Sequence, residues 1–157
     1  MYEGGIREPM MVKWPGVTPA GTVCDEPVTS TDFYPTMLEM SGSPSKPDQH
    51  VDGKSWVPLL KGKALERGPL FWHYPHYGNQ GGSPASAIRD GDWKLIVFYE
   101  DNRGIELYNL KDDVGETKNL APKHPQIVQK LHTKLKAWLS SVDAKFPSPN
   151  PDARDKK

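Results

Sequence analysis

The residues best suited to chemistry lie in one segment, LFWHYPHYGNQGG, which spans residues 70–82. His73 and His76 are three residues apart, and Tyr74 and Tyr77 are interleaved with them. Imidazole nitrogens can hydrogen-bond to hydroxyl groups or to a leaving oxygen, and aromatic faces can stack on sugars or aryl groups. These four side chains are therefore the candidate substrate-binding rim. The alternative is that the aromatic residues belong to a core and the histidines are incidental.

A second candidate group opens the chain, where Gly4 and Gly5 stand just ahead of Arg7. Backbone N–H groups of a glycine turn can form a nest for an anion, with an arginine beside it. Arg7 is equally compatible with a buried structural role, paired with a carboxylate of a part of the protein beyond this chain. The sequence predicts an anion-proximal turn and leaves both roles of Arg7 open.

The remaining reactive side chains predict no catalytic group and no metal site in this chain. The single cysteine, Cys24, cannot form an internal disulfide and has no identifiable activating base, so we expect a small core residue. DDVGE (112–116) predicts a solvated turn, because its carboxylates lack the spacing of a metal loop. Arg89 and Lys94 flank an Asp-Gly pair and are expected on the surface of a hairpin.

Composition excludes several classes of protein. The 157 residues suit one domain, or one domain and a piece of another. Lys+Arg and Asp+Glu both number 20, and a formal net charge of zero argues against a nucleic-acid binder. No run of apolar residues is long enough to predict a membrane span. The start lacks the apolar stretch of a signal peptide.

Residues 66–142 predict a meander of strands followed by a helix. PLFWHY reads as a strand, with Trp72 in the core beneath the rim. ASAIRDGDWKLIVFYE reads as a hairpin with Asp90-Gly91 as a type I′ turn, and IELYNL as a further strand. Helical spacing then appears in HPQIVQKLHTKLKAWLSSV, in which the apolar positions are Ile127, Leu131, Leu135, Trp138 and Val142.

The first part of the chain predicts a strand and a helix. PMMVKW (9–14) is apolar on both sides, which is typical of a buried strand. TSTDFYPTMLEMSG predicts a helix that Ser30 or Thr31 can cap and that Gly42 can end. Its expected apolar face carries Phe33, Met37 and Met40.

Five segments in a fixed order resemble the C-terminal third of a sulfatase, of the arylsulfatase type within the alkaline-phosphatase superfamily. They are YEGGIREPMMVKWPG, STDFYPTMLEMSG, DGKSWVPLLKG, AIRDGDWKLI and ELYNLKDDVGETKNLA, and the resemblance runs from Tyr2 to Val142. It implies an α+β fold: a small antiparallel sheet of about four strands packed by a long C-terminal helix, preceded by a strand-helix remnant of an α/β catalytic domain. The implied parts are residues 1–65, the incomplete catalytic domain, 66–146, the C-terminal subdomain, and 147–157, a flexible tail.

The resemblance also implies that this chain is a fragment of a larger enzyme, with Met1 as an added start. The larger enzyme would hydrolyse sulfate esters of a sugar or an aryl compound. Sulfatases use a formylglycine, made within a Cys/Ser-x-Pro-x-Arg motif, and a carboxylate cluster that binds calcium. This chain holds neither motif, since Cys24 is followed by DEPVT. We therefore expect both groups in a preceding part, and expect this chain alone to be inactive.

The implied partners are the preceding catalytic domain and a sulfated small molecule or glycan. In this interpretation the chain supplies structural support and part of the substrate-pocket rim. Its exposed apolar surface would permit self-association, and the whole enzyme would be exported, to the periplasm, the medium or a lysosome. Two alternatives stay open. One is a carbohydrate-binding module that uses the aromatic residues of 70–82, and the other is a part of a related phosphate or phosphonate ester hydrolase.

Overall fold

The computed structural model describes residues 1–79, 81–100, 102–148 and 150. The chain divides into two compact units, one formed by residues 9–67 and the other by residues 1–8 together with 68–157. The first eight residues thus group with the last ninety rather than with the segment that follows them. Most of the predicted tail, residues 147–157, lies outside the described residues.

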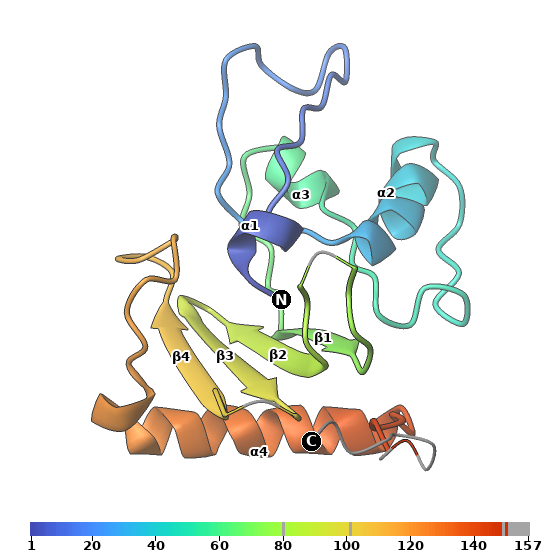
Figure 1. The fold of residues 1–157 in the computed structure, drawn as a ribbon. Helices are drawn as coiled ribbons and strands as arrows, with labels where there is room; N and C mark the ends of the chain where they lie inside the picture. Colours follow the sequence, from blue (N-terminus) through green and yellow to red (C-terminus); the bar gives the residue numbers. More distant parts are fainter. Residues whose placement is uncertain (80, 101, 149, 151–157) are drawn as a thin grey trace. The chain divides into compact units, whose positions relative to one another are not determined.

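The larger unit is built on a four-stranded antiparallel sheet in the order β1-β2-β3-β4 (Figure 1). Its strands are β1 (Leu70–Tyr74), β2 (Ala85–Asp90), β3 (Trp93–Phe98) and β4 (Ile105–Asn109). Each strand pairs with the next one along the chain. The predicted meander is confirmed, because alternating apolar residues and short glycine-containing turns favour hairpins.

The turn between β2 and β3 lies one residue later than predicted. Asp90 pairs with Trp93, so the two loop residues are Gly91 and Asp92. Gly91 has a φ of 62°, whereas Asp92 does not have a positive φ. A type I′ turn needs positive φ at both loop positions, so that prediction is wrong. The glycine at the first loop position supplies the left-handed conformation instead.

The long helix α4 (Pro125–Ser141) lies along one face of the sheet (Figure 1). A short 3₁₀ turn, η2 (Ala121–Lys123), precedes it. The leucines of α4 that are buried against the sheet are spaced by four: Leu131, Leu135 and Leu139. Trp138 stacks on Phe71 of β1, with ring centroids 4.8 Å apart and planes 7° apart. The predicted docked helix is confirmed, and Val142 follows its last residue.

The opposite face of the sheet packs against the start of the chain. Met1 and Tyr2 pack against this face, just before the short helix α1 (Glu3–Ile6). Trp72 joins them, because neighbouring side chains of β1 point to opposite faces. The buried residues of this cluster are Ala85, Ala87, Ile96, Phe98, Tyr108 and Leu110.

The smaller unit contains η1 (Ser30–Asp32), α2 (Phe33–Met40) and α3 (Val57–Leu60). The strand predicted at residues 9–14 is wrong, since no strand is described anywhere in residues 9–67. A strand is stabilised by pairing with a neighbour, and this unit offers none. Met11 is accordingly 98% exposed.

The helix at residues 30–40 forms as predicted, but its cap and its buried face differ. Thr29 caps it in a capping box with Asp32, in place of Ser30 or Thr31. Two residues of the expected apolar face are largely exposed, Phe33 by 41% and Met37 by 48%. Thr36 is buried instead, and its hydroxyl accepts the Trp56 N–H at 3.1 Å.

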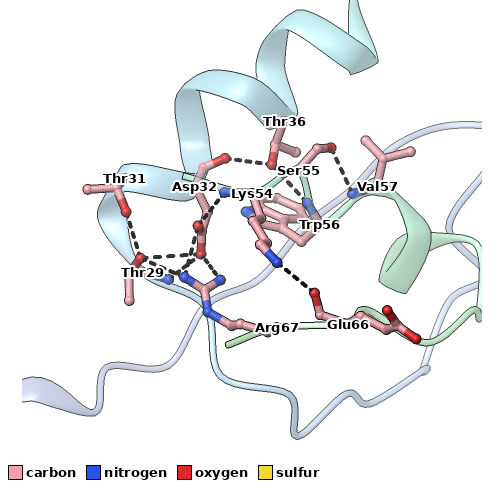
Figure 2. A network of polar contacts seen from close by, with 10 residues as sticks. All are labelled: Thr29, Thr31, Asp32, Thr36, Lys54, Ser55, Trp56, Val57, Glu66 and Arg67. Atoms are coloured by element: carbon pink, nitrogen blue, oxygen red, sulfur yellow. Dashed lines mark hydrogen bonds and ion pairs between the residues drawn. The ribbon is translucent and has the colours of Figure 1, made fainter. Parts of the chain in front are cut away.

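Asp32 organises the polar interior of this unit (Figure 2). Its buried carboxylate accepts the N–H of Thr29 at 2.7 Å and the N–H of Lys54 at 2.9 Å. The guanidinium of Arg67 pairs with both carboxylate oxygens. Because a buried carboxylate is stable only when paired and hydrogen-bonded, these contacts hold the three segments together.

Candidate functional site

A buried ion cluster fixes the first residues of the chain on the sheet. Lys94 of β3 is 0% exposed, and its Nζ lies 2.9 Å from Glu3 Oε1 and 2.8 Å from Glu116 Oε1. The backbone N–H of Glu3 donates to Glu116 Oε2 at 2.5 Å. Arg89 Nη1 lies 3.8 Å from Glu3 Oε2, and its side chain is largely buried. The expectation that Lys94 and Arg89 are surface residues of the hairpin is therefore wrong.

The turn at residues 112–116 delivers Glu116 to this cluster. Asp113 accepts the backbone N–H groups of Thr117 and Lys118, each at 2.9 Å. These bonds, that from Thr117 first, lower the pKa of the Asp113 carboxyl. Glu116 has a left-handed φ of 53°, and its side chain is buried. The prediction of a solvated turn is wrong at Glu116.

The calcium ion and formylglycine that the resemblance implies do not fit the described residues. Among them, no group of three or more His, Cys, Asp and Glu side chains could hold a metal ion. Two carboxylates with several contacts are already engaged, Asp113 by backbone N–H groups and Asp32 by Arg67. Cys24, expected in a core, is exposed.

A hollow of 510 Å³ lies beside β1 on the face that packs against the start of the chain. Its aromatic lining comes from Tyr2, Trp72, Tyr74 and Phe98. The remaining lining residues are Met1, Ile6, His73, Gly81, Gly82, Ser83 and Arg103. The hollow thus brings the side chain of one predicted rim residue, Tyr74, to the start of the chain.

Arg103 is a charged residue that lines this hollow. Its guanidinium lies 3.8 Å from the centroid of the Phe98 ring and donates to Ser83 Oγ at 2.6 Å. A guanidinium binds anionic oxygens, and aromatic faces pack against sugar rings. The arrangement is suited to a ligand that combines a ring with a negative charge.

His73 points to the other face of β1, where its ring is hydrogen-bonded to the segment that follows α4. Its Nε2–H donates to the carbonyl of Lys145 at 2.8 Å, because a carbonyl can only accept. In the neutral ring Nδ1 then accepts from the Ser86 hydroxyl at 2.6 Å. The Tyr99 hydroxyl completes this series of hydrogen bonds by donating to Ser86 Oγ at 2.5 Å. Burial raises the pKa of the Tyr99 hydroxyl. Both ring nitrogens of His73 are thus engaged within this unit.

The other predicted rim residues are exposed: Tyr74 ends β1, and His76 and Tyr77 follow it. The rings of Tyr74 and His76 lie edge to face with their centroids 5.4 Å apart. Tyr77 is 69% exposed, and its hydroxyl donates to Glu100. The rim assignment of these residues and of His73 stays a prediction.

Gly4, Gly5 and Arg7 lie in and just after the turn α1. The Gly5 N–H donates to the Tyr2 carbonyl at 2.9 Å, so this group is already used within the turn. Arg7 Nη1 lies 3.7 Å from Glu3 Oε2, which gives it a carboxylate partner inside this chain, and half of its side chain is exposed. Neither glycine has a positive φ, and no atom lies within 4 Å of a Cβ added at either position. Within the part of the chain that the structure describes, nothing therefore requires glycine there.

The comparisons with known proteins point to one family. Residues 1–141 match the family described as N-sulphoglucosamine sulphohydrolase, C-terminal. The chain belongs to this family. The resemblance to sulfatases is thereby confirmed, and the chain is a sulfatase C-terminal region. Across the part of the chain that the structure describes, no helix is long and apolar enough to cross a bilayer.

Similar proteins agree with this assignment. A sulfatase of Formosa agariphila is 38% identical over 178 residues, which cover 97% of this chain and 32% of the relative. A structure described as a 2-O GAG sulfatase is 25% identical with a TM-score of 0.62, over 78% of this chain and 27% of that chain. A protein solved in complex with its substrate, D-glucosamine-2-N,6-O-disulfate, is 26% identical with a TM-score of 0.59, over 80% and 25%. This sulfatase C-terminal region spans a third or less of the length of these proteins.

The residues that sequence reasoning missed are the buried ion cluster and Arg103. Lys94 did carry a signal: alternation along WKLIVF places it on the same strand face as Ile96 and Phe98, which are buried. Its partner Glu3 is 91 positions away, and no local pattern could connect them. Arg103 lies in a turn and had no periodicity to mark it.

Proposed function

We propose that this chain is the C-terminal part of an enzyme that hydrolyses sulfate esters of a carbohydrate or an aryl compound. The observation that carries the proposal is the family match over residues 1–141. Two similar structures support a sugar substrate. One is described as a 2-O GAG sulfatase, and the other holds a disulfated glucosamine as its substrate.

In this proposal the catalytic groups lie in a preceding part of the longer protein. The calcium ion and formylglycine would be held there, because the described residues of this chain do not fit them. This chain supplies structural support and part of the substrate-pocket rim. The residues assigned to the rim are His73, His76, Tyr74 and Tyr77, and those assigned to the anion-proximal turn are Gly4, Gly5 and Arg7.

Within the proposed rim, the hollow beside β1 brings together several side chains that can bind a ligand. Trp72 and Tyr74 offer aromatic faces to a sugar ring, and Arg103 lines the same hollow. Tyr2, which directly precedes the anion-proximal turn, also lines this hollow. Such contacts would orient the substrate and would leave the sulfate transfer to the preceding part.

The smaller unit would contact that preceding part through its exposed apolar side chains. Met11, Phe33 and Met37 are large apolar residues left exposed in this unit. Covering such side chains is worth about 1.5–3 kcal/mol each. In the isolated chain the same surface would favour self-association.

The test uses the longer protein that contains this chain. Sulfate release is measured with sulfated monosaccharides and an aryl sulfate, and phosphate release with matched phosphate and phosphonate monoesters. The proposal predicts that kcat/KM is larger for one of the sulfate esters than for any phosphate or phosphonate ester. Preference for phosphate or phosphonate esters would support the related hydrolase instead. Carbohydrate binding without turnover of any ester would support a binding module.

A further inference from the structure

We propose that Lys94 is a positioning residue, which holds the turn Glu3–Arg7 in place for the sulfatase reaction. The link to the reaction rests on the proposed function, whereas the hold on the turn rests on the buried ion cluster alone. Lys94 itself lies in the sheet, and it acts through Glu3, which directly precedes Gly4 and Gly5.

The contacts make Lys94 the centre of the cluster. Its ammonium group lies 2.9 Å from Glu3 and 2.8 Å from Glu116, and all three side chains are at most 5% exposed. The two carboxylates lie against the same ammonium group, and Glu116 also accepts the backbone N–H of Glu3. Without the ammonium group, two buried negative charges would repel across this contact. Arg7 and Arg89 lie 3.7 and 3.8 Å from Glu3 but have no such contact with Glu116, so the turn would relieve the repulsion by leaving the sheet.

Glu116 shows that the cluster is specified by more than one element. A residue with a side chain rarely adopts a φ of 53°, and such a conformation persists only where the surroundings impose it. Here the N–H groups of Thr117 and Lys118 fold the preceding turn around Asp113. The side chain of Glu116 is thereby directed toward Lys94.

The cluster presents a particular surface of the turn outward. Gly4 and Gly5 are exposed, and none of the described residues requires a glycine at either position. A pair of glycines in a helical turn is unfavourable relative to alanine, so close approach by a group outside this chain explains them. Release of Glu3 would shift this surface and Tyr2, which lines the hollow.

The first arm of the test uses this chain and hydrogen exchange. Lys94→Met removes the ammonium group and keeps an apolar stem of similar length. We expect the amide N–H groups of Glu3 and Arg7, which donate to Glu116 and to Glu3, to exchange at least tenfold faster. Residues 95–98 should keep their protection. The matched control is Lys134→Met, which removes a partly exposed pair with Asp90 in the same unit and should leave the turn unchanged.

The second arm measures the longer enzyme with an aryl sulfate at a temperature well below unfolding. Lys94→Met should lower kcat/KM at least tenfold, and kcat itself should change. The kcat/KM of Lys134→Met should stay within twofold of that of the unaltered enzyme. If the unaltered enzyme hydrolyses sulfate esters and Lys94→Met is folded with full activity, positioning is wrong and the proposed function stands. If the unaltered enzyme has no sulfatase activity, the proposed function fails, and the exchange arm still decides whether Lys94 holds the turn.

A milder variant covers the case in which Lys94→Met does not fold. Lys94→Gln keeps a polar side chain that can still donate a hydrogen bond, and it removes the positive charge that balances Glu3 and Glu116. We expect the same pattern in both arms: faster exchange at Glu3 and Arg7 and a lower kcat/KM, with protection of residues 95–98 retained. Unchanged exchange at the turn in this variant would overturn the proposal.

Discussion

At the scale of single residues, Gly5 offers a test in which stability and activity move apart. Alanine is favoured over glycine in a helical turn by about 0.5–1 kcal/mol, and no atom of this chain would meet the added methyl group. Gly5→Ala should therefore leave the unfolding free energy of this chain unchanged or slightly raised, as measured by urea denaturation. The same change should lower kcat/KM of the longer enzyme.

The control for Gly5→Ala is Gly42→Ala, because Gly42 has a φ of 69° at the end of α2. This variant should destabilise the chain, since alanine is strained in the left-handed region. Full activity of the longer enzyme with Gly5→Ala would show that no group needed for the reaction closely approaches Gly5.

The rim assignment predicts a graded loss of activity. Tyr74→Ala and His76→Ala should lower kcat/KM of the longer enzyme by tenfold or more, or about 1.4 kcal/mol or more of transition-state binding. Because both side chains are exposed, melting temperatures should move little. His73→Ala should instead lower stability, since its ring holds Lys145 and Ser86. The comparison uses kinetics and thermal melts of the three variants. Full activity of Tyr74→Ala and His76→Ala would show that these residues do not bind the substrate.

His132 predicts an acid limit to stability. Burial, and next the positive charge of Lys136, lower the pKa of its imidazole below the usual value near 6.5. The unfolded chain then binds a proton at a higher pH than the folded chain does. The stability that His132 preserves in its neutral form is present above about pH 6.5 and is lost as pH falls through the lowered pKa. His132→Gln should remove this slope from urea denaturation curves measured between pH 7 and pH 5, and parallel curves for the two proteins would refute it.

Lys94 illustrates what residue patterns could and could not predict about the site. Strand alternation placed it on a buried face, but a lysine beside an Asp-Gly turn also fits an exposed hairpin. The decision depends on Glu3 and Glu116, which only the tertiary fold brings to it. His73 shows the same limit, since its partner Lys145 is 72 positions away.

At the scale of elements, α4 should account for a large share of the stability of its unit. Leu135 is buried against the sheet, and replacing such a leucine by alanine costs about 2–5 kcal/mol. Leu135→Ala should lower the urea midpoint accordingly. The control is Lys130→Ala, an exposed position of the same helix, which should change the unfolding free energy by about 0.5 kcal/mol or less. Equal effects of the two changes would mean that α4 does not dock as described.

Elements with a local signal were predictable, and those that depend on a neighbour were not. The four strands and α4 follow from periods of two and of about 3.6 residues in the sequence. Residues 9–14 have the composition of a buried strand, yet they have no strand to pair with in their unit. The prediction for the apolar face of α2 was wrong for a related reason. Asp32 pairs with Arg67, and Thr36 accepts the Trp56 N–H, so these two polar side chains are buried and the expected apolar face is largely exposed.

At the scale of the whole molecule, family and fold were predictable because five separate segments occur in a fixed order. The sheet-and-helix unit is self-consistent, with both faces of the sheet packed against parts of its own unit. What the order of segments could not predict is that residues 1–8 belong to that unit rather than to the segment that follows. That grouping reflects the packing of Met1 and Tyr2 on the sheet together with the ion cluster, which joins residues far apart in the chain.

The central claim is that this chain is a non-catalytic part of a sulfatase, and sulfate release tests it most directly. The purified chain and the longer protein that contains it are incubated in parallel with calcium and an aryl sulfate. The account predicts turnover by the longer protein and none by the chain, because loss of a single cooperating catalytic group already lowers rates by orders of magnitude. Turnover by the chain that scales with its concentration and survives further purification would contradict the account.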